Sequence, residues 1–202
     1  MIRALMVDVD GVLVRGRVDG RRWSASIEAD LGVTEADLQQ EFFRPHWDDI
    51  VTGKRGLVEA LTPVLKKIAR HLCHEDLIDY WFAHDAKLDQ KLIADLDRQR
   101  EMGTKVFLAT NQEHLRASYL IDVLGLGQHC DAIYYSAALG CRKPDLPFFE
   151  MATALSNIPA RELLLLDDLA ENVLAARAVG WRAIQWLPDS ALPEVLQKYC
   201  EP

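Results

Sequence analysis

The stretch ALMVDVDGVL, residues 4–13, places an apolar run directly before two aspartates that flank a single valine. The apolar run predicts a buried strand, and Asp10-Gly11 predicts a turn at its end. Two carboxylates this close to a strand end lose hydration and repel each other unless a cation lies between them. The alternative is that the acids only accept backbone hydrogen bonds in the turn, so the interpretation depends on the rest of the chain.

The composition of the 202-residue chain is that of an ordinary folded protein, with 50% hydrophobic and 27% charged residues. The net charge of −8, without a long Lys/Arg stripe, argues against nucleic-acid binding. The first residues enter the predicted strand at once, which leaves no room for a signal peptide, and no apolar run is long enough to span a bilayer. The four cysteines have no short paired spacing, which favours free thiols. We therefore expect a cytoplasmic protein that binds neither membranes nor nucleic acid.

Several continuous apolar runs predict the strands of a parallel sheet that is covered on both faces. Helical patterns separate the later runs, and this alternation predicts a doubly wound, Rossmann-like α/β core. The predicted strands are residues 4–8, 105–109, 132–135, 163–167 and 182–186, and the helices between the later strands are residues 112–124, 147–155 and 170–179.

The segment between the first two strands has a helical pattern and is too long for a simple crossover. We therefore predict a helical cap at residues 16–88, inserted after the first strand, and an α/β core of residues 1–15 and 89–202. Open α/β sheets bind ligands beyond the carboxyl ends of their strands, which is where this insertion begins. The predicted helices of this region are residues 24–31, 34–43, 56–72 and 74–84, and a helix at 89–101 leads into the second strand.

Three further polar clusters follow predicted strands. Thr110-Asn111 comes after the second strand, where it can cradle an anion, although capping of the next helix is the simpler role. Lys143 precedes a proline, which favours an extended conformation, although a surface turn is the commoner outcome. Asp167-Asp168 ends the fourth strand, and helix capping explains one of these acids but hardly both.

The carboxyl ends of parallel strands meet at one edge of a sheet, so all of these clusters are expected around one crevice. Four carboxylates, one lysine and a Thr-Asn cradle indicate a divalent cation that holds a phosphoryl group. Mg²⁺ fits best because it prefers oxygen ligands and leaves room for substrate oxygens, whereas no His/Cys set indicates zinc.

This ordered set of motifs resembles the four motifs of the haloacid dehalogenase (HAD) superfamily, and the helical insertion falls where that superfamily carries a cap. Within the superfamily, the chain is most similar to the branch of sugar-phosphate phosphatases and the phosphatase domain of epoxide hydrolases. The cap phrase FFRPHW, residues 42–47, is similar to that branch. The four motifs are Asp8-Val-Asp10-Gly-Val, Thr110-Asn111, Gly140-x-x-Lys143-Pro-Asp and Asp167-Asp168 with Asn172.

The resemblance implies a phosphatase in which Asp8 is the nucleophile and becomes an aspartyl-phosphate. It implies that Asp10 protonates the leaving alcohol and then activates the hydrolytic water. Thr110, the Asn111 backbone and Lys143 would hold the phosphate oxygens, and Lys143 would also contact the nucleophile. The expected substrate is a small phosphorylated metabolite, with sugar phosphates among the candidates.

The same resemblance implies a Mg²⁺ site formed by the Asp8 carboxylate, the Asp10 backbone carbonyl and one acid of the last motif. Of the two adjacent acids, Asp168 is favoured as the direct ligand and Asp167 as a ligand through water. Many acids around one cation suit phosphoryl transfer, where catalysis is mainly positioning and charge neutralisation. No feature of the sequence indicates the oligomeric state.

Other functions share parts of this motif set. A 2-haloacid dehalogenase also uses an aspartate nucleophile, but it needs neither a metal nor a leaving-group acid, so Asp10 and the doubled acids favour phosphoryl transfer. A phosphomutase of the same fold stays open. So does a protein without turnover, either a phospho-aspartate switch of the receiver-domain kind or a catalytically silent partner protein.

The cap contains aromatic and basic residues that could face a substrate. Aromatic residues at helical spacing are usually buried, so we expect Trp23, Trp47 and Trp81 in the interior of the cap. Arg44 and Lys54 are more simply solvated charges. The sequence pattern of the cap therefore predicts no particular substrate.

Overall fold

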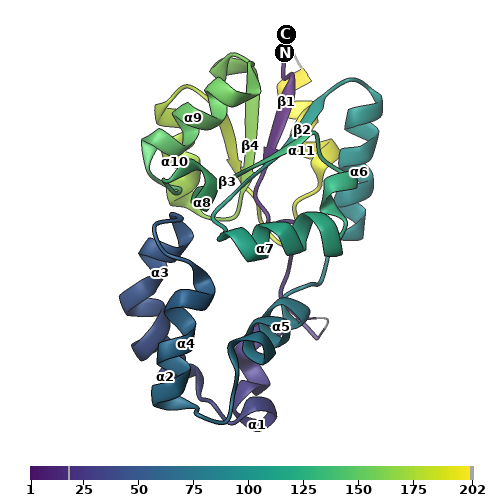
Figure 1. Cartoon of the computed structure of the whole chain (residues 1–202). Coiled ribbons are helices and arrows are strands. Elements are labelled where there is room, and N and C mark those ends of the chain that lie inside the picture. Colours follow the sequence, from purple (N-terminus) through teal and green to yellow (C-terminus); the bar gives the residue numbers. More distant parts are fainter. Residues whose placement is uncertain (18, 201–202) are drawn as a thin grey trace.

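A five-stranded parallel sheet forms the centre of the protein, in the order β3-β2-β1-β4-β5 (Figure 1). The computed structural model describes residues 1–17 and 19–200. The parallel sheet confirms the predicted doubly wound α/β core, because its strands are joined by helices that cross over its faces. The strands are β1 (Ala4–Val7), β2 (Lys105–Thr110), β3 (Ala132–Tyr135), β4 (Leu163–Asp167) and β5 (Arg182–Gln185).

The helices of the core differ from the prediction in the start of one helix and in two helices that were not predicted, at Ser136–Leu139 and Leu192–Cys200. The helix predicted to begin at residue 112 begins at His114, because the Glu113 carboxylate caps it by accepting from the backbone N–H groups of Leu115 and Arg116. The final helix, α11, was not predicted. The core helices are α6 (Gln90–Glu101), α7 (His114–Ser118), α8 (Ser136–Leu139), α9 (Leu146–Ser156), α10 (Ala170–Ala178) and α11 (Leu192–Cys200), with short helical turns at Tyr119–Val123, Leu126–Gln128 and Ala160–Glu162.

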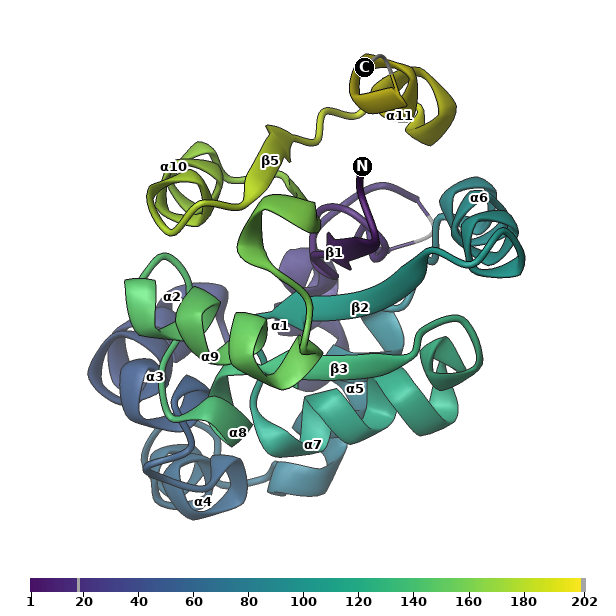
Figure 2. The same cartoon turned by 90° about the horizontal axis from the view of Figure 1, so that it is seen from above.

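Apolar side chains project from both faces of the sheet, which explains why each strand is a continuous apolar run in the sequence. Leu5 and Val7 of β1 join one hydrophobic cluster with α6 and α11, whereas Ala4 and Met6 join another with α9 and α10. Figure 2 shows α6 and α11 on one side of the sheet and α9 and α10 on the other. The central strand is thereby shielded from water on both faces.

The segment between β1 and α6 is helical and lies beyond the carboxyl ends of the strands (Figure 1). One of its helices, α3, was not predicted, and Pro45 lies in its first turn, where a missing N–H is tolerated. Its side chains form a separate hydrophobic cluster around Phe42, Leu61 and Phe82. The helices are α1 (Ile27–Leu31), α2 (Glu35–Leu38), α3 (Arg44–Val51), α4 (Leu57–Ile68) and α5 (His74–His84), with helical turns at Trp23–Ser26 and Gln39–Phe43.

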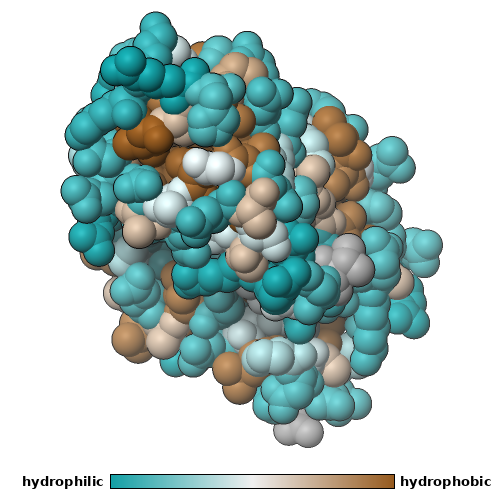
Figure 3. Space-filling model, turned by 90° about the horizontal axis from the view of Figure 1, so that it is seen from below, coloured by the Kyte–Doolittle hydropathy of each residue, from teal (hydrophilic) through white to brown (hydrophobic). Residues whose placement is uncertain are grey.

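The two stretches of chain that link this segment to the core, around Val14 and Leu88, run antiparallel and pair with each other. The N–H of Arg15 donates to the carbonyl of Lys87, and the N–H of Asp89 donates to the carbonyl of Leu13, each at 2.9 Å. The boundaries that we propose for the cap, at residues 16 and 88, lie within this pairing. Figure 3 views the molecule from this side, where the surface is mainly hydrophilic with a few hydrophobic patches. Within the described part of the chain, no helix has the length and apolar character to cross a membrane.

The loop after α3 contacts the core at Gly53. Its φ of 71° lies in the left-handed region, and a Cβ there would overlap the backbone of Ala137 in α8. Asp48 of α3 also forms an ion pair with Arg142, with 2.8 Å between their charged atoms. The close backbone approach at Gly53 is the stronger of these two contacts, because the Asp48 side chain is 80% exposed and such a pair contributes about 0–1 kcal/mol.

We expect Gly53→Ala to lower the free energy of unfolding by about 2–4 kcal/mol, because it adds a steric overlap to an unfavourable φ. Gly125→Ala is the matched control, since Gly125 has a φ of 77° and nothing within 4 Å of its added Cβ. The control isolates the penalty of placing alanine in the left-handed region, about 1–2 kcal/mol. Urea unfolding of both variants measures the difference, and equal losses would show that the Gly53 contact contributes nothing.

Candidate active site

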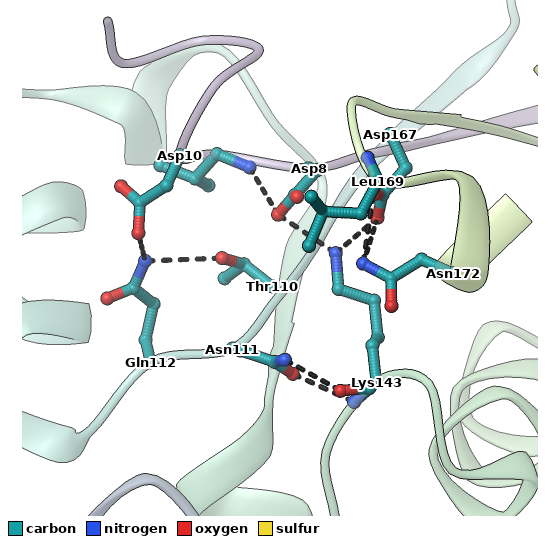
Figure 4. A network of polar contacts seen from close by, with 10 residues as sticks. Asp8, Asp10, Thr110, Asn111, Gln112, Lys143, Asp167, Leu169 and Asn172 are labelled. Carbon is teal, nitrogen blue, oxygen red and sulfur yellow. Dashed lines mark hydrogen bonds and ion pairs between the residues drawn. The ribbon is translucent and has the colours of Figure 1, made fainter. Parts of the chain in front are cut away.

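The carboxyl end of the sheet brings the predicted polar residues together. Asp8 follows β1, Thr110 ends β2 and Asp167 ends β4, and β1 lies between the other two strands. Lys143 enters from the segment between α8 and α9. Figure 4 shows the polar groups of these residues turned toward one another. Four segments that are far apart in the sequence therefore meet at one place.

A buried lysine holds two buried carboxylates at the centre of the site. The Lys143 Nζ lies 2.9 Å from an Asp8 oxygen and 2.6 Å from an Asp167 oxygen. None of the three residues is more than 6% exposed. Burial alone would lower the pKa of Lys143, but the two carboxylates outweigh it and raise that pKa above its ordinary value. The lysine is therefore charged at neutral pH and neutralises only part of the surrounding negative charge.

Asp8 is held in an environment that disfavours its charge. Burial is the largest cause and raises the pKa of Asp8 to about 7, against the opposing effect of Lys143. The charges of Asp167 and Asp10 contribute to this value in the same direction as burial. One Asp8 oxygen accepts a 2.8 Å hydrogen bond from the backbone N–H of Val9. A cation that binds beside Asp8 would therefore stabilise its ionised form.

Asp10 lies in the exposed turn that follows Asp8. Its carboxylate accepts a 2.7 Å hydrogen bond from the Gln112 side chain, which also donates to the Thr110 hydroxyl at 3.2 Å (Figure 4). Gln112 was not among the predicted site residues. Its one signal in the sequence is its place directly after the Thr-Asn motif, and an amide at a helix start is more simply read as a cap.

Asn111 and Lys143 are joined by a reciprocal pair of hydrogen bonds. The Asn111 amide group donates to the Lys143 carbonyl at 2.9 Å, and its carbonyl oxygen accepts from the Lys143 backbone N–H at 2.8 Å. The side chain thus fixes the segment that carries the lysine. This function of the side chain was not predicted, and the predicted role of the Asn111 backbone in binding phosphate remains a prediction.

Three acids form a cluster that fits a metal ion. Oxygens of Asp8, Asp167 and Asp168 lie within 4.8 Å of one another. Asp168 approaches the turn after Asp10 so closely that a Cβ at Gly11 would overlap its carboxylate. Burial and the charge of Asp167 raise the pKa of Asp168. Crowded oxygen donors with unfavourable mutual repulsion are the set that Mg²⁺ binds well.

The Asp167 carboxylate is engaged by protein donors on both oxygens. The Asn172 amide group donates to them at 2.9 and 3.1 Å, and the Leu169 backbone N–H donates at 2.9 Å. With the Lys143 contact, Asp167 is held by three different residues. Asp168, which is half-buried, instead borders the cavity described below. The two adjacent acids therefore have different surroundings.

A second buried ion pair connects the cap with the core. The Arg116 guanidinium, 2% exposed, lies 3.5 Å from the Asp85 carboxylate and donates to the carbonyls of Phe82 and Asp85 at the end of α5. It also lies over the rings of Phe82 and Tyr119, at 5.1 and 5.4 Å from their centroids. Burial, then the charge of Asp10, raises the pKa of Asp85 to about 6, while Arg116 lowers it. An arginine on a short helix has no sequence signal for such burial, and neither residue was predicted.

A cavity of about 660 Å³ opens beside the acids, between core and cap. Trp47 and Trp81 pack within the cap as expected, whereas Trp23 also lines this cavity. The core contributes the acids of the site and the cap contributes a partly aromatic wall. The lining side chains that matter below are Asp10, Asp168 and Leu169 from the core, and Trp23, Leu38 and Phe43 from the cap.

The sequence profile of the haloacid dehalogenase-like hydrolase family matches residues 2–180. The chain therefore belongs to this family and is a hydrolase of the HAD superfamily, as the motif order predicted. The family assignment accounts for the order in which the four polar segments follow their strands.

Two curated proteins show this relationship over most of the chain. Drimenol cyclase drtB of Aspergillus calidoustus is 25% identical over 190 residues, which cover 91% of this chain but only 34% of the cyclase. Phosphatase MT3486 of Mycobacterium tuberculosis is 26% identical over 192 residues, which cover 90% of this chain and 86% of that protein. The chain thus spans about a third of the first protein and most of the second.

A solved structure with the same fold is that of a HAD family enzyme from Bacteroides thetaiotaomicron in complex with magnesium and inorganic phosphate. The TM-score is 0.81, the identity is 15%, and the match covers 96% of this chain and 99% of the other. At this identity the comparison shows the fold alone, over 96% of the chain.

Proposed function

We propose that the protein is a Mg²⁺-dependent phosphatase that hydrolyses a small phosphomonoester through an aspartyl-phosphate on Asp8. The buried Lys143 ammonium, held between Asp8 and Asp167 with Asp168 adjacent, carries this proposal. This arrangement has more negative than positive charge, and a divalent cation with a phosphoryl group would complete it. A relative named as a phosphatase and a structural neighbour that binds magnesium and phosphate support the same activity.

The residues of the chain supply both proton transfer and covalent catalysis. An Asp8 oxygen attacks phosphorus, the bond from phosphorus to the alcohol oxygen breaks, and Asp10 gives that oxygen its proton. Water then attacks the phosphorus of the aspartyl-phosphate, Asp10 takes the proton of the water, and Asp8 leaves as a carboxylate. The Gln112 amide, 2.7 Å from the Asp10 carboxylate, would keep the acid oriented for both steps.

The phosphate oxygens would be held by Thr110, Asn111 and Lys143. The Lys143 Nζ is already 2.9 Å from Asp8, so it can contact the oxygens of a phosphoryl group as it moves to that residue. The Asn111 side chain supports this role because it fixes the backbone of Lys143. Positioning of this kind accounts for most of the catalysis in phosphoryl transfer.

The Asp8 carboxylate, the Asp10 backbone carbonyl and Asp168 would hold the Mg²⁺, with Asp167 acting through water. The protein donors that occupy Asp167 and the open surroundings of Asp168 support this assignment. When bound, Mg²⁺ neutralises charge on the phosphoryl oxygens and on the acids around them. Residues 16–88 would act as the cap that covers the bound ester.

The first test is release of inorganic phosphate from a panel of phosphomonoesters, sugar phosphates included, with Mg²⁺ or with EDTA. We expect turnover with Mg²⁺, loss of turnover in EDTA and recovery when Mg²⁺ is restored. Halide release from a 2-haloacid without Mg²⁺ would identify a dehalogenase instead. A single phosphorylation of each molecule, without further turnover, would identify a phospho-aspartate switch and overturn the proposal.

A further inference from the structure

We propose that the cavity between core and cap binds an uncharged, apolar leaving group, so that the substrate is the phosphomonoester of an alkyl or aromatic alcohol. The inference rests on the proposed phosphatase activity and concerns the part of the substrate that is released. Its basis is the cavity of about 660 Å³, which begins at Asp10 and Asp168 and is bordered on the cap side by Trp23, Leu38 and Phe43.

The position of the cavity indicates which part of the substrate it receives. Asp10 lines it, and Asp10 is the residue that would protonate the leaving oxygen. Lys143 and Thr110, which would hold the phosphate, are buried and are not among the described residues that line it. The alcohol portion of a bound ester would therefore project into the cavity. Its volume lies within the range of small-molecule sites, about 300–1,000 Å³.

The aromatic part of the cap wall is rigidly supported, and it lies beside polar side chains of the same wall, namely Arg21, Arg22, Ser24, Glu35 and Gln39. Trp23 stacks on Trp81 with 5.2 Å between ring centroids, and Phe43 packs edge-on against Trp47 and Trp81 at 5.5 and 5.6 Å. Leu169 faces the cavity from the core and is 47% exposed. Apolar surface that stays open to water is stabilised when an apolar ligand covers it, and a fixed wall loses little side-chain entropy on binding.

The charges around the cavity disfavour a second anionic group on the substrate. Each arginine of the described lining has a carboxylate partner, and Asp85 adds a further carboxylate on the cap side of the cavity. A carboxylate on the leaving group would have to displace one of those partners and approach these acids. The arginine pairs are Arg15–Asp89 at 3.0 Å, Arg21–Asp19 at 2.9 Å and Arg22–Glu35 at 3.6 Å.

The test compares kcat/KM for hexyl phosphate and phenyl phosphate with kcat/KM for phosphoglycolate and glucose 6-phosphate, all with Mg²⁺. We expect the two apolar esters to be preferred by about tenfold or more. A preference for the charged or the hydroxylated ester overturns the inference but leaves a phosphatase. No turnover of any ester overturns the proposed phosphatase itself, so the two failures are distinguishable.

Variants of the cap wall locate the preference. We expect Phe43→Ala to reduce kcat/KM for hexyl phosphate by about tenfold or more and to change that for methyl phosphate little. Phe43→Leu should retain most of the preference, and Leu174→Ala is the control, because Leu174 is 64% exposed and lies outside the described cavity lining. The ratio between the two esters cancels any general loss of folded protein, and an unchanged ratio in Phe43→Ala overturns the inference.

Binding gives a readout that does not require turnover. Hexylphosphonate cannot be hydrolysed, and with Mg²⁺ present it should bind about tenfold more tightly to the wild type than to Phe43→Ala by calorimetry. It should also change the tryptophan fluorescence, because Trp23 lines the cavity. A Trp23→Phe variant, as the control, should lose part of this change. Equal affinity for hexylphosphonate and methylphosphonate would contradict an apolar binding site.

Discussion

Asp8→Asn is expected to reduce Mg²⁺-dependent phosphate release on the order of 10⁴-fold or more, because the variant has no carboxylate to form the covalent intermediate. The amide has nearly the shape of the carboxylate, so the fold and the Lys143–Asp167 pair should persist. Phosphate release under saturating ester measures the loss. Asp122→Asn, at an exposed acid outside the site, should retain full activity.

The same substitution is expected to stabilise the metal-free protein. Burial raises the pKa of Asp8 from 3.8 to about 7, so the native state prefers the protonated acid. The wild type therefore loses stability as the pH rises between these two values, and asparagine, which does not ionise, avoids that loss. In EDTA, Tm of Asp8→Asn should exceed that of the wild type at pH 7.5 and match it near pH 3.5.

Two outcomes would contradict this account of Asp8. Phosphate release by Asp8→Asn at near wild-type rate would show that another group is the nucleophile. A variant less stable than the wild type at pH 7.5 in EDTA would show that the ion pair with Lys143, at 2.9 Å, outweighs the burial of the carboxylate. Added Mg²⁺ should stabilise the wild type by about 2.7 kcal/mol at one hundred times its Kd, and the variant less.

Lys143→Met should damage both stability and activity. It removes the one ammonium between two buried carboxylates, and breaking such a pair costs about 3–5 kcal/mol because charge is left buried without a partner. Loss of a positive group that stabilises the transferring phosphoryl should reduce kcat by about 10²–10³-fold. Urea unfolding and phosphate release at a concentration where the variant is folded measure the two effects separately.

Lys105→Met is the matched control for this substitution. Lys105 also forms an ion pair, with 2.7 Å to Asp131, but its side chain is 58% exposed. Solvent screening limits such a pair to about 0–1 kcal/mol. If both variants lose the same stability, burial does not determine the contribution of Lys143. If Lys143→Met keeps full activity, Lys143 does not contact the phosphoryl group.

Residues at the ends of the central strands could be predicted because chain topology alone determines where they lie. An apolar run followed by Asp8, or by Asp167, identifies both a strand and the edge at which its carboxylate emerges. Lys143 could be predicted because it precedes a proline in an ordered series of motifs. For these residues, the local sequence alone is enough to predict their position at the carboxyl edge of the sheet.

The supporting residues could not be predicted because their function depends on tertiary contacts. Gln112 lies beside Asp10 only because β2 is adjacent to β1. Arg116 is buried because the end of α5 packs against α7, and the helical pattern of the sequence does not predict this contact. The cap was predictable as a helical insertion, but the wall that Trp23 and Phe43 form depends on how its helices pack.

The central position of β1 also determines the order in which the chain can fold during synthesis. Residues Ala4–Val7 are synthesised well before their neighbours in the sheet, which are residues 105–108 and 163–166. Such distant pairings form slowly, whereas the helical cap has local contacts and a hydrophobic cluster of its own. The strand that leads to Asp8 therefore cannot complete its pairing until residues 163–166 have been synthesised. Its exposure to other nascent chains is longest during that interval, when a chaperone would have most to protect.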